Sequence, residues 1–225
     1  MRPEEILNRV KNPNHIAGIY NYCDRWCERC AFTSRCLNCE LSIENEKNLE
    51  KHDVDSKEFW DEMGKIYEGT MQLIRHIAEK EGIDLSKVDV EKDMQRTKDA
   101  EDRAGQHPIS LMAKKYIDIK EGFYKNEKQL FVQRANEIKI QHEIGINAKK
   151  IKAETDEITD VLAIIGWYSP QIWVKMMRAL TGKFNGEQWQ DENGFPRDSD
   201  GSAKVALIEV DRSIGAWGQI GRAHV

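Results

Sequence analysis

Long apolar runs are missing from this chain of 225 residues. The longest nearly unbroken one, residues 161–168, is far shorter than the roughly 20 residues of a bilayer-spanning helix. The amino-terminal residues also lack the apolar core of a secretory signal. We therefore expect a cytoplasmic protein with no membrane partner.

An excess of positive charge is missing as well. Charged residues make up 32% of the chain, and the formal net charge is −5. A surface of this kind is well solvated and lacks the basic bias of proteins that bind polyanions. Nucleic acid is therefore disfavoured as a partner, and a protein partner or a redox partner is expected.

The alternation of apolar and polar residues that marks β-strands does not extend over any useful length. Apolar residues instead recur at steps of three and four, as they do along one face of a helix. Four such stretches are present, at residues 55–82, 108–144, 155–182 and 202–220. The sequence predicts an all-α fold in which residues 55–225 form an antiparallel bundle of about four helices.

Local signals mark the ends of these helices. Asp55 and Glu58 have the spacing of a capping box, and Pro108 suits the first position of a helix. Gly82 tolerates the left-handed conformation that ends a helix. Pro170 lacks an amide proton and is expected to bend the third helix.

Two polar stretches separate the predicted elements. Residues 42–54 are interpreted as a connector. Residues 87–104 are dominated by charged side chains with almost no apolar periodicity, which favours a solvated linker or an exposed helix.

Cysteine is absent from most of the chain, and residues 23–39 contain all five copies. They are Cys23, Cys27, Cys30, Cys36 and Cys39, in the run CDRWCERCAFTSRCLNC. An odd number of closely spaced cysteines without a secretory signal favours metal binding over disulfides. Residues 1–41 are therefore predicted to be a cysteine-rich metal-binding segment, which has too few apolar residues for a core of its own.

Two sets of four ligands are consistent with the spacing. Cys23, Cys27, Cys30 and Cys36 would hold a [4Fe–4S] cluster, whose larger body a short loop with unequal spacings can wrap. Cys39 would instead replace Cys23 in a zinc site made of two Cys-x2-Cys pairs. The first set predicts electron transfer, redox sensing or a structural cluster, and the second predicts an interaction module that binds a protein or nucleic-acid partner.

The spacing within CERCAFTSRC resembles the iron–sulfur loop of the DNA glycosylases of the helix-hairpin-helix superfamily. The resemblance covers this loop alone and implies a cluster, because no glycine-rich hairpin with a catalytic lysine or aspartate accompanies it. The run Cys23, Cys27, Cys30 is also similar to the radical SAM signature, but Arg29 stands where that family has an aromatic residue. The loop and its flanks further resemble an uncharacterised bacterial cysteine-motif family, which implies no function.

Signatures of catalytic sites are missing too. A di-iron site in a helical bundle needs Glu-x-x-His pairs, and the sequence contains none. His76 and His142 are therefore interpreted as surface or structural residues. No phosphate-binding loop and no nucleophile with an adjacent base is present. The sequence leaves the catalytic residues unknown and does not decide whether the protein is an enzyme.

Overall fold

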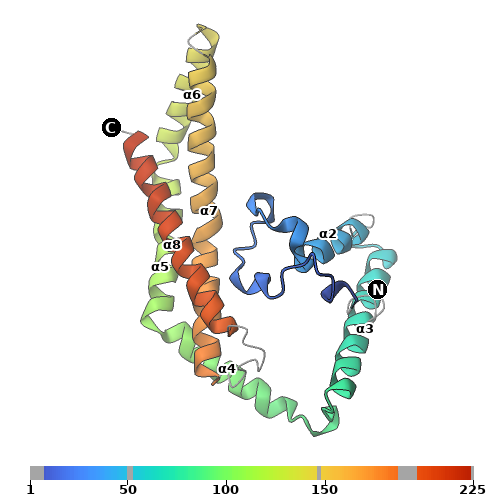
Figure 1. Ribbon diagram of the computed structural model, residues 1–225. Coiled ribbons are helices and arrows are strands. Elements are labelled where there is room, and N and C mark those ends of the chain that lie inside the picture. The colour runs from blue at the N-terminus through green and yellow to red at the C-terminus, as the bar shows by residue number, and fades with distance from the viewer. Residues whose placement is uncertain (1–7, 50–52, 146–147, 187–196, 224–225) are drawn as a thin grey trace. The chain divides into compact units, whose positions relative to one another are not determined.

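The computed structural model describes residues 8–49, 53–145, 148–186 and 197–223. Over these residues the fold is all-α, as predicted, and contains no strand. In chain order the elements are the 3-10 helices η1 (Ile19–Tyr22), η2 (Cys27–Arg29) and η3 (Thr33–Arg35), then α2 (Leu37–Leu49), α3 (Lys57–Lys80), the 3-10 helix η4 (Leu85–Lys87), α4 (Val90–Gln106), α5 (Pro108–Asn126), α6 (Lys128–Glu143), α7 (Ala148–Phe184) and α8 (Asp198–Ala223) (Figure 1). Among these helices, none combines the length and the apolar character that crossing a bilayer requires.

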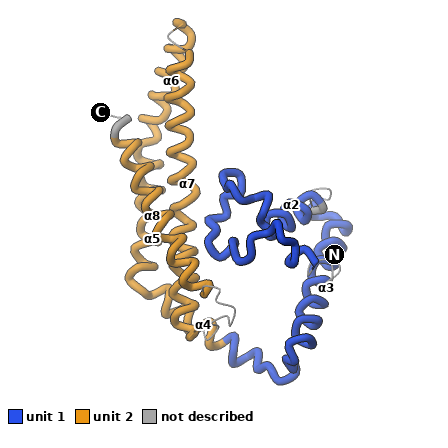
Figure 2. Tube along the Cα trace, in the orientation of Figure 1, with its two compact units in different colours: residues 1–94 blue, residues 95–225 orange. Residues whose placement is uncertain are grey.

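The chain divides into two compact units, residues 1–94 and 95–225, called unit 1 and unit 2 below (Figure 2). Unit 1 contains the cysteines, α2 and α3, and unit 2 contains α5 to α8 with most of α4. This division does not test the predicted domain boundaries, residues 1–41 and 55–225, which stay predictions.

The core of unit 2 lies between α7 and α8. Val161 and Ile165 of α7 form a buried cluster with Ala216 and Ile220 of α8. Residues early in α7 therefore meet residues late in α8, so the two helices are antiparallel and lie side by side (Figure 1). Packing of this apolar face supplies most of the stability of such a pair.

Hydrogen bonds connect the end of α7 to the start of α8 and connect α8 to α5. Arg178, near the end of α7, donates a hydrogen bond of 2.7 Å to Asp198 at the start of α8. Trp217 Nε1 of α8 donates to Tyr116 Oη of α5 at 2.8 Å. α5 also packs against α7, so unit 2 is a helical bundle built around α7.

The described part of residues 55–225 contains six α-helices, α3 to α8, where about four were expected. α2 occupies most of the supposed connector at residues 42–54, and the charged stretch 87–104 is largely helix α4. In α4 the buried residues are Ala100 and Ala104, which are too small to produce an apolar periodicity. The third difference is at Glu127, where the long second helix divides into α5 and α6.

The inward face of α5 includes Phe123 and Tyr124, which pack against the core of unit 2, but it leaves part of the apolar stripe outside. Ser110, Ala113 and Lys120 are buried, whereas Met112 and Ile119 are 70% and 57% exposed. Small side chains at the first two positions allow a neighbouring helix to approach closely. Helix contact here follows side-chain size more than side-chain hydrophobicity.

Several predicted helix ends are confirmed. Pro108 stands at the start of α5, and Gly82, two residues after α3, has φ of +68°. The cap of α3 is Ser56, one residue after the predicted Asp55, and its side chain accepts a hydrogen bond from the Phe59 amide at 3.2 Å. α7 begins earlier than expected and continues as helix through Pro170.

Unit 1 has almost no apolar core. In its described residues only Cys39 and Ala78 are buried. A segment that buries so little apolar surface needs another kind of contact to stabilise a single structure. The cysteines and the polar contacts around them are therefore the candidates for this stabilising contact.

Candidate metal centre

Three of the five cysteines terminate a short 3-10 helix. Cys23 follows η1, Cys30 follows η2 and Cys36 follows η3, each in extended backbone conformation. The fourth, Cys27, is the first residue of η2. Repeated tight turns fold the segment back on itself, which is how closely spaced cysteines approach one another.

Backbone amides point at two of the sulfurs. The Arg25 amide donates a hydrogen bond to Cys23 Sγ at 3.1 Å, and the Phe32 amide donates to Cys30 Sγ at 3.4 Å. Both bonds run from residue i+2 to residue i. Amide donors of this kind stabilise negative charge on sulfur, so both turns suit a thiolate.

Cys27 interacts with other cysteines of the segment. Burial raises its pKa to about 11, and so do the neighbouring Cys39, which also hydrogen bonds to it, and then Cys23 and Cys36. The pKa of Cys27 is raised first because burial disfavours its thiolate and then because the neighbouring thiols would add negative charge beside it. A bound cation removes that penalty, because thiolates must be deprotonated to serve as ligands.

Cys39 is the most deeply placed of the five. Its exposed fraction is 5%, whereas the other four cysteines are only partly buried. It lies in the first turn of α2, and Cys36 immediately precedes that helix. Both cysteines therefore lie at the amino-terminal end of α2.

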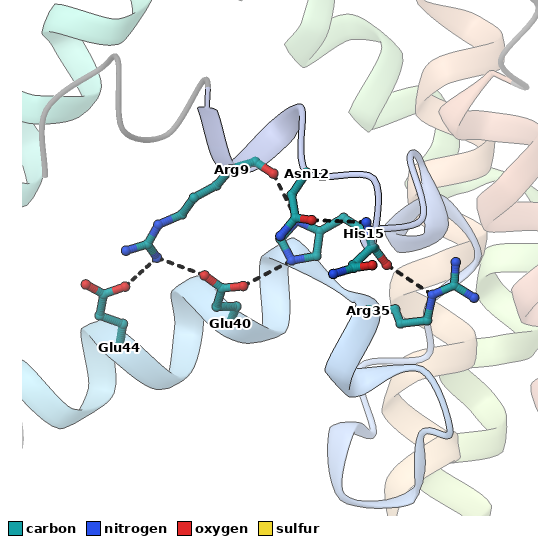
Figure 3. Close-up of polar contacts among 7 residues, drawn as sticks. Arg9, Asn12, His15, Arg35, Glu40 and Glu44 are labelled. Atoms are coloured by element: carbon teal, nitrogen blue, oxygen red, sulfur yellow. Dashed lines mark hydrogen bonds and ion pairs between the residues drawn. The ribbon is translucent and has the colours of Figure 1, made fainter.

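A polar cluster fastens the start of the described chain to α2 (Figure 3). His15 Nε2 lies 3.0 Å from Glu40 Oε2, and its Nδ1 lies 3.0 Å from the carbonyl oxygen of Arg9. Arg9 Nη1 donates to Glu40 at 3.1 Å and to Glu44 at 2.6 Å. The His15 side chain is only 8% exposed, and the cluster links residues 9–15 to Glu40, the neighbour of Cys39 in the sequence.

A second contact joins the turn before Cys36 to the same region. Arg35 Nε donates to the carbonyl oxygen of Asn14 at 3.0 Å (Figure 3). The Ile16 amide donates to the Arg35 carbonyl oxygen at 3.0 Å. The residues that flank Cys36 and Cys39 are thus anchored on both sides. Sequence reasoning missed this role of His15 and Glu40, since their separation of 25 residues gives no motif.

Cationic side chains accompany the cysteines. The Arg29 guanidinium stacks over the Trp26 ring, 3.9 Å from its centroid, and Arg25 has a φ of 58°. Positive charge near a four-thiolate site offsets part of its negative charge. A cation over an aromatic face also keeps part of the ring covered.

The structure places the predicted ligands in one segment but does not close them on a metal. Across the described ranges, no group of three or more His, Cys, Asp or Glu side chains is arranged to hold an ion. Cys39, Cys23 and Cys36 are near enough to Cys27 to act on its thiol, but Cys23 and Cys39 belong to different predicted sets. Cys30, which both sets include, is not among the thiols that act on Cys27.

The two histidines considered for a site in the bundle are exposed. His76 lies in α3 and His142 in the last turn of α6, as expected for surface residues. Neither belongs to a metal-holding group in the described part of the chain. The cysteine segment remains the metal site that the sequence predicts, and the described residues neither close it on a metal nor offer another.

Comparison of the chain with known protein families, with curated proteins and with solved structures finds no match in any of the three.

Proposed function

We propose that the cysteine segment of unit 1 binds a metal centre through its thiolates and that this centre holds unit 1 together. The observation that carries the proposal is the contrast inside unit 1. Its described residues bury almost nothing apolar, yet its most buried cysteine, Cys39, contacts Cys27 with two further thiols nearby. Small domains without a core commonly rely on a metal.

The position of Cys39 favours a zinc-stabilised interaction module as the kind of metal centre. Its burial and its contact with Cys27 favour a ligand set that includes it. α3 adds a surface for a partner, because Trp60 and Tyr67 are 62% and 68% exposed on an amphipathic helix. Apolar anchors at this helical spacing suit a groove on a partner protein better than they suit nucleic acid.

A [4Fe–4S] cluster on Cys23, Cys27, Cys30 and Cys36 is the second candidate. The amide bonds to Cys23 Sγ and Cys30 Sγ favour it, because hydrogen bonds to cluster sulfurs tune the reduction potential. In this form the protein would carry electrons or sense redox state. The resemblance of the loop to that of the DNA glycosylases supports the same cofactor.

Anaerobic purification of the full chain tests both forms at once. Iron and acid-labile sulfide with a broad visible absorption band would support the cluster. A colourless protein with one zinc per chain would support the interaction module. A chain that contains no metal, and binds neither zinc nor iron with sulfide when these are supplied, would overturn the proposed function.

A further inference from the structure

One face of α3 carries large apolar side chains that are exposed to solvent. Five of them are between 37% and 68% exposed. Side chains of this kind usually lie inside a protein, and a contiguous apolar patch on a surface commonly marks an interface. We call this face the α3 stripe, and it consists of Trp60, Met63, Tyr67, Thr70, Ile74 and Ile77.

The α3 stripe has the spacing of a coiled coil. Its members follow one another at steps of three, four, three, four and three residues, which are the a and d positions of a heptad. Side chains at these positions form one line that packs against a neighbouring helix. From Trp60 to Ile77 the line is about 26 Å long. A second helix is therefore the element that fits it.

A second copy of α3 in antiparallel orientation fits the stripe by size. In an antiparallel pair the a positions of one helix face the d positions of the other. Trp60 then lies opposite Ile77 of the second copy, and Tyr67 lies opposite Thr70, so each large side chain meets a smaller one. A parallel pair would instead place Trp60 against Trp60 and Tyr67 against Tyr67.

The charges of α3 favour the same orientation. Residues 57–68 contain four acidic and two basic side chains, whereas residues 69–80 contain two basic and one acidic side chain, histidine excluded. An antiparallel pair sets the acidic half of each helix beside the basic half of the other, with Asp61 and Arg75 on the same flank of the stripe. A parallel pair sets like charges beside each other, which costs free energy.

Thr70 can be buried in such an interface without an unpaired donor. Its hydroxyl already donates a hydrogen bond of 2.9 Å to the Ile66 carbonyl oxygen of the same helix. The Thr70 oxygen can still accept a hydrogen bond, and the Tyr67 hydroxyl of the second copy is a donor at the facing position. The central pair of the stripe is thus polar but can be satisfied when buried.

We propose that two copies of this chain associate through the α3 stripe as an antiparallel helix pair related by a two-fold axis. In such an interface the same patch of both copies is used, and each contact occurs twice. This inference rests on the proposed function for the interaction module, and it names a second copy of the chain as the partner. The stripe contains no cysteine, so its pairing is measured separately from metal content.

Sedimentation of the full chain over a range of concentrations tests the pairing. Wild type should sediment as two chains and dissociate on dilution. Ile74→Lys should weaken the dimer by about a hundredfold or more, because each copy would bury an unpaired ammonium group. Gln72→Lys places the same side chain on the exposed polar face of α3 and should leave the dimer unchanged. Far-UV circular dichroism shows whether both variants have folded.

Charge reversal tests the antiparallel orientation. Asp61→Arg and Arg75→Asp should each weaken the dimer by about 2- to 10-fold at low salt, and the double variant should restore it. The two residues lie two heptads apart in one helix, so the rescue comes from contacts between copies. In a parallel pair each of these residues faces its own counterpart, and the double variant would restore nothing.

The outcomes separate this inference from the proposed metal centre. A wild type that stays monomeric, with the stripe covered by another part of its chain or by a different protein, would overturn the inference. A dimer that Ile74→Lys leaves intact, or that Gln72→Lys weakens equally, would overturn it too. Missing rescue in the double variant would overturn the antiparallel pairing. Metal analysis of the same samples decides the other question, because a metal-free wild-type dimer would overturn the metal centre and support the stripe.

Discussion

Unit 1 and unit 2 are both helical, but a different kind of internal contact stabilises each of them. Unit 2 buries an apolar cluster between two long antiparallel helices, with Ile165 fully buried at its centre. The described residues of unit 1 bury only Cys39 and Ala78 and rely on ion pairs, turns and thiols. The difference shows that two units of similar helical content can be stabilised by different contacts, because helix formation alone contributes little stability.

The proposed metal centre would account for the placement of the cysteines in unit 1. A metal centre contributes most in a segment with little apolar surface to bury, since folding free energy and binding free energy are then the same quantity. Cysteines in unit 2 would add little to a core that already packs well. The absence of cysteine from residues 95–225 agrees with that division.

The largest single-residue effect on stability is expected in unit 2. Ile165→Ala leaves a cavity at a position with 0% exposure and should lower the free energy of unfolding by about 2–5 kcal/mol. Ile214→Ala on α8, at 65% exposure, is the matched control and should change it by less than about 0.5 kcal/mol. Thermal unfolding measures both. Equal effects from the two variants would contradict the packing of α7 on α8.

Within unit 1, removal of the polar cluster at Glu40 should lower stability more than any other change except removal of the thiols. Glu40→Ala removes a partner from both His15 and Arg9, and we expect a loss of about 1 kcal/mol because Glu40 is itself 45% exposed. Faster proteolysis of residues 9–16 is the readout. Glu46→Ala, an exposed carboxylate on the same helix, is the control. If both variants are cleaved at the same rate, the cluster does not anchor the segment.

Two glycines of unit 1 should respond oppositely to one substitution. Gly82→Ala forces a side chain into φ of +68° and should destabilise by about 1 kcal/mol. Gly64→Ala lies inside α3 in open space and should stabilise that helix by roughly 0.5–1 kcal/mol. Helix content measured against temperature tests the pair. A stabilising Gly82→Ala would show that α3 does not end there.

The smallest effect is expected at Tyr124 in unit 2. Its hydroxyl is buried and finds no hydrogen-bond partner among the described residues, so Tyr124→Phe should be neutral or stabilise by up to about 1 kcal/mol. Burial also raises the pKa of this phenol above its usual value of 10.0. The native state therefore favours the neutral form, and its stability contribution is present below pH 10 and lost as the pH rises further.

Alkaline unfolding curves check the second part of this prediction. Wild type should lose more stability than Tyr124→Phe above pH 10, whereas the two should run in parallel at neutral pH. A larger alkaline loss in the variant would contradict the buried placement of the phenol.

The sequence predicted the features that depend on local chemistry. The helical class, the start of α5 at Pro108 and the turn at Gly82 each follow from one residue type and its backbone preference. The last helix was predicted at residues 202–220 and spans Asp198–Ala223. The clustering of the cysteines was visible in the spacing itself.

Features that depend on contacts distant in sequence were not predicted. α4 is buried through Ala100 and Ala104, which leave no apolar pattern, and α5 turns Ser110 inward while Met112 faces out. The anchoring of α2 by His15 joins residues too far apart in sequence to form a motif.

Hydrogen exchange of the full chain, with its metal and after removal of the metal by a chelator, measures the contrast between the two units most directly. We expect amides of residues 8–49 to lose protection when the metal is removed, while amides of residues 148–186 and 197–223 keep theirs. Protection of residues 8–49 that is the same with and without metal would contradict a metal-stabilised unit 1. Equal loss in both units would contradict the independence of the core between α7 and α8.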